Sequence, residues 1–207
     1  MGKREDGYYP TDPYATEALR VWLSRMMPAV LRDSWVDPAA GYGGLLEGLG
    51  VEHSRRHAIE LHHRHRAELV RRVPASHVVI GDGLVKPWNA AHAAMNPDFD
   101  NETMTAFVAR ALKRQDDRGG LVVCLALATW WHSDALRARG GGLRRPSYVL
   151  VPDQRVSCDG TGRGDMRAID WLVWQPGVTR TEVVWLPPAA PAPALLAEHR
   201  RLASRTA

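Results

Sequence analysis

The feature that most constrains the fold is a regular alternation of short apolar segments with helical patterns between residues 34 and 128. The apolar segments are 34–37, 57–61, 77–81, 91–95 and 121–128. The helical patterns between them are 43–49, 63–72 and 102–113. Such an alternation favours a mostly parallel sheet wound by right-handed crossovers. The sequence therefore predicts an α/β domain with a central sheet and helices on both faces.

A helix precedes this alternation, and a different pattern follows it. Asp12 is suited to be an N-cap with Pro13 at the first helical position, and apolar residues recur at helical spacing as far as Leu31. Beyond Gly142 there are three strand-like segments, 147–151, 168–174 and 181–186. No convincing helix separates them, so we expect the far edge of the sheet to finish in antiparallel pairs.

The length of the chain favours one domain. Its 207 residues, 45% of them hydrophobic, are enough for one well-buried core and too few for two generous ones. We expect a single domain over residues 1–186, with a loose leader at 1–9, and a Pro/Ala-rich tail over 187–207 that is weakly amphipathic from 195 to 203. No window approaches the roughly 20 apolar residues of a membrane span. We therefore expect a soluble, cytoplasmic protein without a membrane partner.

The cysteines and histidines do not predict a metal site. Cys124 lies in an apolar run and Cys158 in a polar segment, without the paired spacing of metal ligands. His62, His63 and His65 lack the i, i+4 pair and accompanying carboxylate of a zinc helix. We expect them to lie on a solvated basic helix.

Arginines gather in a Gly-rich region near the C-terminal third of the chain. They are Arg144, Arg145, Arg155, Arg163 and Arg167. Arginine binds phosphate bidentately and keeps its charge, so this region could follow a nucleic-acid backbone. The net charge of +4 is compatible with such a partner. A solvated loop is an equally favoured interpretation.

Acidic or amide residues stand at the ends of four successive apolar segments: Asp37, Glu60, Asp82 and Asn96. The carboxyl ends of parallel strands meet at the edge where open α/β sheets bind ligands, so we expect these side chains to surround one pocket. The turn after Asp37 is Gly-rich but lacks the third glycine of a dinucleotide fingerprint. A carboxylate there repels phosphate and attracts an ammonium group.

The same series suggests the identity of the ligand. Glu60 can accept hydrogen bonds from two ribose hydroxyls, and Asp82 can accept one from an adenine amino group. An amino acid, a ribose and an adenine together make S-adenosylmethionine. Any one of these residues alone is more often a turn or capping residue, whereas the ordered series favours a shared ligand.

These motifs resemble those of class I S-adenosylmethionine-dependent methyltransferases, in particular the phage- and prophage-type DNA adenine-N6 methyltransferases. The resemblance extends over most of the chain, from Tyr9 to Trp174. It implies a Rossmann-like class I methyltransferase fold, S-adenosyl-L-methionine as cofactor and DNA as partner. The residues it implies for the cofactor are Tyr9, Pro10, Thr11, Asp37, Pro38, Ala40, Gly41, Glu60, Leu61, Asp82 and Gly83.

The resemblance also implies that Asn96-Pro97-Asp98-Phe99 is the catalytic motif. The Asn96 side-chain oxygen and the Pro97 carbonyl would accept hydrogen bonds from the target amino group, and Phe99 would stack on the flipped base. Methylation at carbon 5 of cytosine is rejected because neither cysteine follows a proline. An alternative is that the motif is only a helix-entry turn in which Asp98 or Asp100 caps the next helix.

Asp98 departs from the family, which has a second proline at this position. The carboxylate leaves both the activity and the target atom open. One alternative is an amino or amide methyltransferase acting on RNA or protein. Another is a catalytically impaired methyltransferase-like module that binds nucleic acid or a partner.

Overall fold

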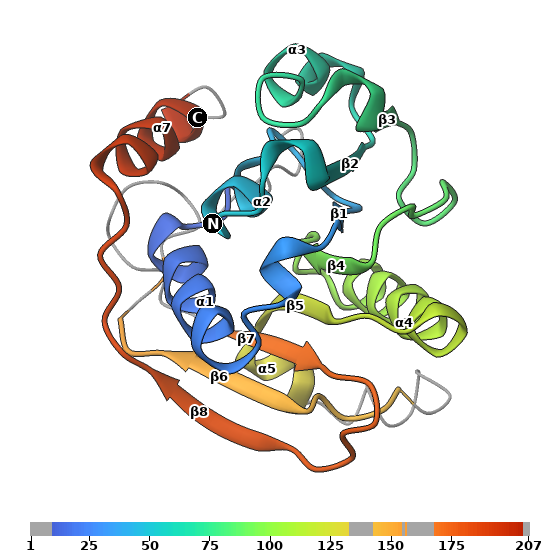
Figure 1. Cartoon of the computed structure of the whole chain (residues 1–207), viewed down its shortest axis with the longest axis vertical. Helices are drawn as coiled ribbons and strands as arrows, with labels where there is room; N and C mark the ends of the chain where they lie inside the picture. The colour runs from blue at the N-terminus through green and yellow to red at the C-terminus, as the bar shows by residue number, and fades with distance from the viewer. Residues whose placement is uncertain (1–9, 133–142, 155, 157–167, 205–207) are drawn as a thin grey trace.

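The structure is a computed structural model that describes residues 10–132, 143–154, 156 and 168–204. Its centre is an eight-stranded sheet in the order β3-β2-β1-β4-β5-β7-β6-β8 (Figure 1). The strands are β1 Trp35–Asp37, β2 Arg56–Glu60, β3 Val78–Ile80, β4 His92–Met95, β5 Val122–Leu127, β6 Tyr148–Pro152, β7 Ile169–Trp174 and β8 Glu182–Leu186. Neighbouring strands are parallel except at β7, which is antiparallel to β5 and to β6. This arrangement confirms the predicted fold class, although β8 pairs with β6 in parallel.

Helices cover both faces of the sheet (Figure 1). They are α1 Pro13–Met26, α2 Gly44–Gly48, α3 Arg66–Leu69, α4 Asn101–Arg118, α5 Ala128–His132 and α7 Pro193–Ser204, with 3-10 turns at Val30–Arg32, His53–Arg55, His63–His65 and Ala75–His77. Side chains of α1 and α2 form one hydrophobic core with Val123 and Leu125 of β5. Those of α4 form a second with Val122 and Cys124, and a small third cluster includes Leu69 of α3. Successive side chains of a strand point to opposite faces, so β5 contributes to both cores.

Helix α1 begins where the sequence predicts and ends earlier. Asp12 is its N-cap and its Oδ1 accepts a hydrogen bond from the Tyr14 N–H at 2.8 Å. The predicted end at Leu31 is wrong, because the helix stops at Met26. Pro28 disfavours the helical conformation of the residue before it, and Met27 accordingly has φ −144° and ψ 56°.

The predicted helix over 63–72 is also shorter than expected. It consists of a 3-10 turn at His63–His65 followed by the four-residue α3. The expectation of a solvated helix is wrong for His65, which is buried. Its ring makes a hydrogen bond with a carboxylate of β2, and this contact holds the segment close to the sheet.

The residues that follow β8 return across the molecule and end in α7, which lies near α1 and α2 (Figure 1). Leu202 of α7 is buried. Arg72, itself buried, donates to Glu47 of α2 at 3.0 Å, to Glu68 of α3 at 3.0 Å and also to Glu198 of α7. Arg201 adds a second bond to Glu68, at 2.6 Å. One ionic network therefore joins α7 to the body of the domain.

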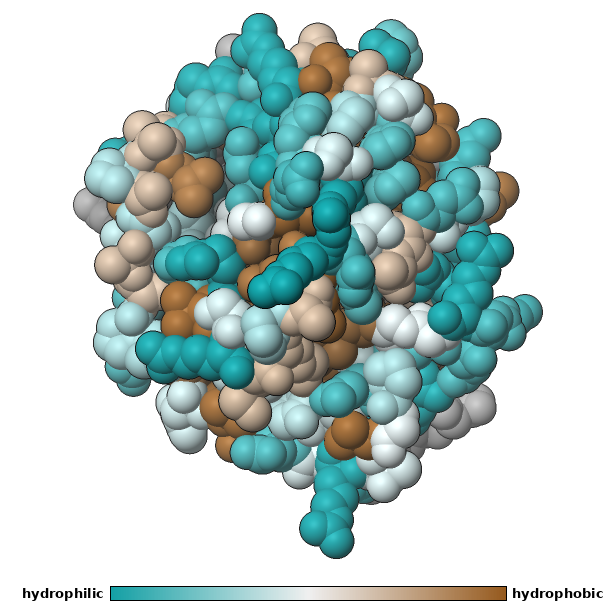
Figure 2. All heavy atoms as spheres, in the orientation of Figure 1, coloured by the Kyte–Doolittle hydropathy of each residue, from teal (hydrophilic) through white to brown (hydrophobic). Residues whose placement is uncertain are grey.

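Polar residues cover most of the face shown in Figure 2, and hydrophobic residues form small separate patches on it. Within the described ranges, no helix combines the length and the apolar character needed to cross a membrane.

Candidate functional site

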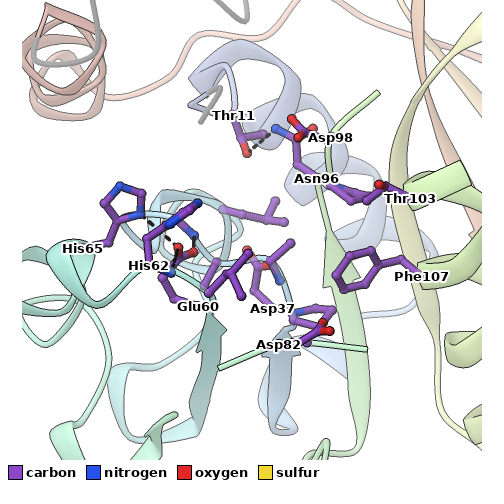
Figure 3. A pocket seen from close by; sticks show the side chains of 18 of the residues that line it. Thr11, Asp37, Glu60, His62, His65, Asp82, Asn96, Asp98, Thr103 and Phe107 are labelled. Carbon is purple, nitrogen blue, oxygen red and sulfur yellow. Dashed lines mark hydrogen bonds and ion pairs between the residues drawn. The ribbon is translucent and has the colours of Figure 1, made fainter. Parts of the chain in front are cut away.

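A cavity of about 300 Å³ lies at the carboxyl ends of β1, β2 and β4 (Figure 3). It is lined by residues that the sequence assigned to cofactor and catalysis, namely Thr11, Asp37, Pro38, Ala40, Gly41, Glu60, Leu61, Asp82, Gly83, Asn96, Pro97 and Asp98. The parallel register of the first strands explains the convergence, because their carboxyl ends open on the same edge.

Asp37, the last residue of β1, is a buried carboxylate in the wall of this cavity. Its pKa is raised from 3.8 to about 7, mainly by burial and also by the nearby Glu60 charge, while the Ala39 N–H opposes the shift. That N–H donates to Asp37 Oδ1 at 3.0 Å. Such a group is close to half ionised at neutral pH, and a cation in the cavity would favour its charged form.

Glu60, the last residue of β2, is held by three hydrogen bonds. Its Oε2 accepts from the Gly41 N–H at 2.7 Å, and its Oε1 accepts from the His62 N–H at 2.8 Å. The His65 ring contributes the third, with Nδ1 at 3.0 Å from Oε1. Glu60 thus ties the turn after β1 to the segment after β2. A carboxylate has about four lone-pair sites, so this arrangement still leaves acceptor capacity on Oε2.

Asp82 and Gly83 follow β3 and also line the cavity. Asp82 is exposed, and its Oδ1 accepts from the Leu84 N–H at 2.7 Å. Gly83 is buried against the turn after β1, where an added Cβ would lie 2.0 Å from the Pro38 carbonyl oxygen. Only glycine allows the two turns to approach this closely.

Asn96 and Asp98 lie at the end of β4 and face the same cavity as Thr11 (Figure 3). The Asn96 side-chain N–H donates to Thr11 Oγ1 at 3.1 Å. In this bond the amide nitrogen of Asn96 is the donor. Asp100, rather than Asp98, caps α4 by accepting from the Glu102 and Thr103 N–H groups.

Other predicted site residues lie elsewhere. Phe99 does not line the cavity and packs against both hydrophobic cores. Pro10 is buried and lines a smaller cavity beside α7. Tyr9 lies outside the described residues.

Of the predicted arginine group, the two members that the structure describes, Arg144 and Arg145, do not line the cavity. The Trp174 ring N–H donates a hydrogen bond to the Arg144 carbonyl oxygen at 2.9 Å. Trp174 pairs with Val122, the first residue of β5, so Arg144 and the exposed Arg145 beside it lie toward the amino edge of the strands. The Arg144 side chain forms an ion pair with Asp116. Arg155, Arg163 and Arg167 fall in ranges that are not described.

Several cavity residues escaped the sequence analysis. They are Ala39, Gly44, Leu45, His62, His65, Leu84, Thr103 and Phe107. Thr103 and Phe107 are four positions apart on α4, so they share one helical face. This spacing was visible in the sequence, but no sequence signal showed that this face turns toward the cavity.

No protein-family model matches the sequence, and no curated protein is similar to it. Solved structures are similar in fold. A protein of Listeria monocytogenes assigned as a class I S-adenosylmethionine-dependent methyltransferase matches with a TM-score of 0.60 and 13% identity, over 97% of this chain and 73% of that one. A protein of Pyrococcus horikoshii assigned as an RNA methyltransferase matches with a TM-score of 0.54 and 16% identity, over 75% of this chain and 80% of that one.

A third similar structure is a modification subunit assigned to a type I restriction enzyme of Vibrio vulnificus. It matches with a TM-score of 0.59 and 12% identity over 98% of this chain. Because the match covers 54% of that subunit, this chain spans about half of its length. Together, the three similarities establish the Rossmann-like class I methyltransferase fold.

Proposed function

We propose that this protein is an S-adenosylmethionine-dependent methyltransferase. The observation that carries the proposal is the convergence of Asp37, Glu60, Asp82 and the Asn96–Asp98 turn on one cavity of the class I fold (Figure 3). Four carboxylates line this cavity, which therefore favours a cationic ligand over a phosphate. The ammonium and sulfonium groups of the cofactor supply that charge.

The residues present fit the cofactor. Asp37 would bind its ammonium group, which would stabilise the ionised form of this buried acid. Glu60 would accept from the ribose through its remaining capacity, and Asp82 from the adenine amino group. The cavity volume of about 300 Å³ is at the lower end of the range for small-molecule sites. When bound, the cofactor supplies an electrophilic methyl group.

We propose that the methyl acceptor is the exocyclic amino group of adenine in DNA. The lone pair of this nitrogen is delocalised into the ring, so the group is a poor nucleophile. The Asn96 oxygen and the Pro97 carbonyl are acceptors that would orient its protons, and Thr11 holds the Asn96 amide in the required orientation. Support for DNA comes from the fold shared with a restriction-enzyme modification subunit. The fold shared with a protein assigned as an RNA methyltransferase makes RNA the main alternative.

A substrate panel tests this proposal. The purified protein is incubated with methyl-labelled cofactor and with DNA, RNA or protein, and we expect label on adenine in DNA. Asn96→Ala should reduce transfer at least a hundredfold and leave the affinity for S-adenosylhomocysteine within about twofold, because Asn96 acts on the acceptor. Labelled RNA or protein without labelled DNA would contradict the DNA assignment. Failure of S-adenosylhomocysteine to raise the melting temperature would contradict the methyltransferase proposal itself.

Asp98 favours a second candidate, a module that binds the cofactor and nucleic acid without turnover. The chain carries a carboxylate at the cavity where the family has proline. If the wild type binds S-adenosylhomocysteine and transfers no label, whereas Asp98→Pro transfers it, this candidate replaces the enzymatic one.

A further inference from the structure

We propose that Arg110, on α4 and outside the cavity lining, is a positioning residue for the wall of the cofactor pocket formed by Asp82–Leu84. The inference rests on the proposed function, since this wall is the one assigned to adenine. It concerns the segment between β3 and β4, which itself forms no regular strand or α-helix.

The segment begins as a single turn closed by Asp82. Its carbonyl oxygen accepts from the Val85 N–H at 3.0 Å and from the Lys86 N–H at 2.9 Å, and its Oδ1 accepts from the Leu84 N–H at 2.7 Å. A single turn cannot pair its own last carbonyl groups, which carry a partial negative charge. The carbonyls of residues 84–86 therefore need donors from outside the turn.

Arg110 supplies those donors. Its Nη1 donates to the Leu84 carbonyl, and its Nη2 donates to the Lys86 carbonyl at 2.8 Å and to the Val85 carbonyl at 3.4 Å. The guanidinium carbon also lies 5.4 Å from the centre of the Trp88 ring. A planar, permanently charged guanidinium can make these contacts together, which an ammonium group cannot.

The contacts reach the cavity through Trp88 and Gly83. The Trp88 ring N–H donates to the Gly83 carbonyl at 2.8 Å. Gly83 packs so closely that an added Cβ would lie 2.0 Å from the Pro38 oxygen and 2.9 Å from the Phe107 ring. Gly83 has no free space around it. A shift of the turn that contains it should therefore also displace its neighbours Asp82 and Leu84, which line the cavity.

Arg114 provides a matched control on the same helix. It too is half-buried and donates to backbone carbonyls of the segment, but to those of Trp88, Ala90 and Ala91. Its bond to Trp88, the residue that both arginines contact, is long at 3.4 Å. All three acceptors precede β4 and do not line the cavity. Loss of Arg114 should therefore lower stability without moving the adenine-facing wall.

The test measures ligand affinity by calorimetry, well below the melting temperature, for the wild type, Arg110→Ala, Arg110→Lys and Arg114→Ala. The ligands are S-adenosylhomocysteine and 5′-methylthioadenosine, which keeps the adenine and ribose and lacks the amino acid. We expect Arg110→Ala to weaken both ligands about tenfold, Arg110→Lys to weaken them about threefold, and Arg114→Ala to stay within twofold of the wild type.

Equal affinities of Arg110→Ala and Arg114→Ala would overturn the inference, and so would a loss with Arg110→Ala that spares 5′-methylthioadenosine. If Arg110→Ala does not fold, Arg110→Lys decides, and wild-type affinity in that variant overturns the inference. Failure of the wild type to bind S-adenosylhomocysteine is a separate result that overturns the proposed function and this inference with it.

Discussion

At the scale of single residues, two carboxylates dominate the site. Asp37 and Glu60 are both buried, and the charge of Glu60 contributes to the raised pKa of Asp37. Glu60 is compensated by three hydrogen bonds, whereas Asp37 accepts one hydrogen bond, from the Ala39 N–H, within the described part of the chain. Ionisation of Asp37 therefore costs folding stability, and this cost is the physical basis of its affinity for a cation.

The first prediction follows from the sign of this shift. The pKa of Asp37 is raised from 3.8 to about 7 on folding, so its contribution to stability is present at low pH and is lost as the pH rises toward 7. Asp37→Asn should remove that loss. Its melting temperature should exceed that of the wild type above pH 7, and the advantage should shrink as the pH falls toward 4. Thermal unfolding across this range checks it, and a pH-independent difference would contradict it.

The second prediction concerns ligand binding at the same residue. An ammonium group is bound best by ionised Asp37, so the wild-type affinity for S-adenosylhomocysteine should rise as the pH increases through about 7. Asp37→Asn should bind this ligand at least tenfold more weakly at pH 8 and show a flatter profile between pH 6 and 8. Calorimetry at several pH values checks both statements. A steep profile retained in Asp37→Asn would assign the titration to another group.

The position of these residues could be predicted from the sequence, but not their surroundings. Asp37, Glu60 and Asn96 stand at or just beyond the ends of short apolar segments, and strand order alone brings such positions to one edge. The contact of His65 with Glu60 depends on the 3-10 turn that returns the chain to the sheet. Phe107 faces the cavity because of the way α4 docks. Neither the His65–Glu60 contact nor the docking of α4 can be predicted from a local sequence pattern.

At the scale of elements, the close approach of two turns fixes the shape of the cavity. Gly83 after β3 contacts the Pro38 carbonyl after β1, and β2 separates these two strands in the sheet. The turns after β1 and β3 therefore meet beyond the carboxyl end of β2, which is where Glu60 lies.

The third prediction tests this contact with Gly83→Ala. The new methyl group would lie 2.0 Å from a backbone oxygen, so the turns must separate. We expect a destabilisation of about 1–3 kcal/mol, as for other overpacked sites, and a loss of affinity for S-adenosylhomocysteine. Gly44→Ala is the control for stability, because its added Cβ meets nothing within 4 Å. Chemical denaturation measures the stability of both variants. Equal stability of Gly83→Ala and Gly44→Ala would contradict the close contact between the two turns.

Periodicity predicted most elements because it reports burial on one or both faces. The strand β5 was recognisable as an unbroken apolar run, and both of its faces are indeed covered. Helix ends were less predictable. The apolar spacing after Met26 continues through Pro28, but the backbone cannot follow it. The sequence predicted only weak amphipathic character for 195–203, whereas the helix there is as amphipathic as α1 and α4 and is held by ionic contacts with distant residues.

At the scale of the whole molecule, the Arg72 network joins segments that are far apart in sequence. Glu47, Glu68 and Glu198 surround a guanidinium whose side chain is 7% exposed. Without Arg72, Glu68 and Glu198 keep Arg201 as a partner, and Glu47 keeps Arg56 at 4.0 Å. Removing one partner of a buried ion pair typically costs about 3–5 kcal/mol.

The fourth prediction is that Arg72→Ala lowers the free energy of unfolding by about 3 kcal/mol and releases α7. Arg71→Ala is the control, because that side chain is 70% exposed and forms a single pair with Glu68. Its effect should stay below about 0.5 kcal/mol. Urea denaturation gives the energies, and limited proteolysis within 187–204 reports the release of the helix. Similar energies for the two variants would contradict the importance of the network.

The buried acid at the end of β1 also has a consequence for the life of the molecule in a cell. A protein that is weakened by its own uncompensated charge, and strengthened when a cation fills the cavity, unfolds more often when that ligand is scarce. Proteases remove unfolded chains, so under the proposed function the abundance of the protein should follow the supply of S-adenosylmethionine. Starvation for methionine should then shorten the half-life of the wild type in a pulse-chase experiment. The half-life of Asp37→Asn should not depend on the methionine supply.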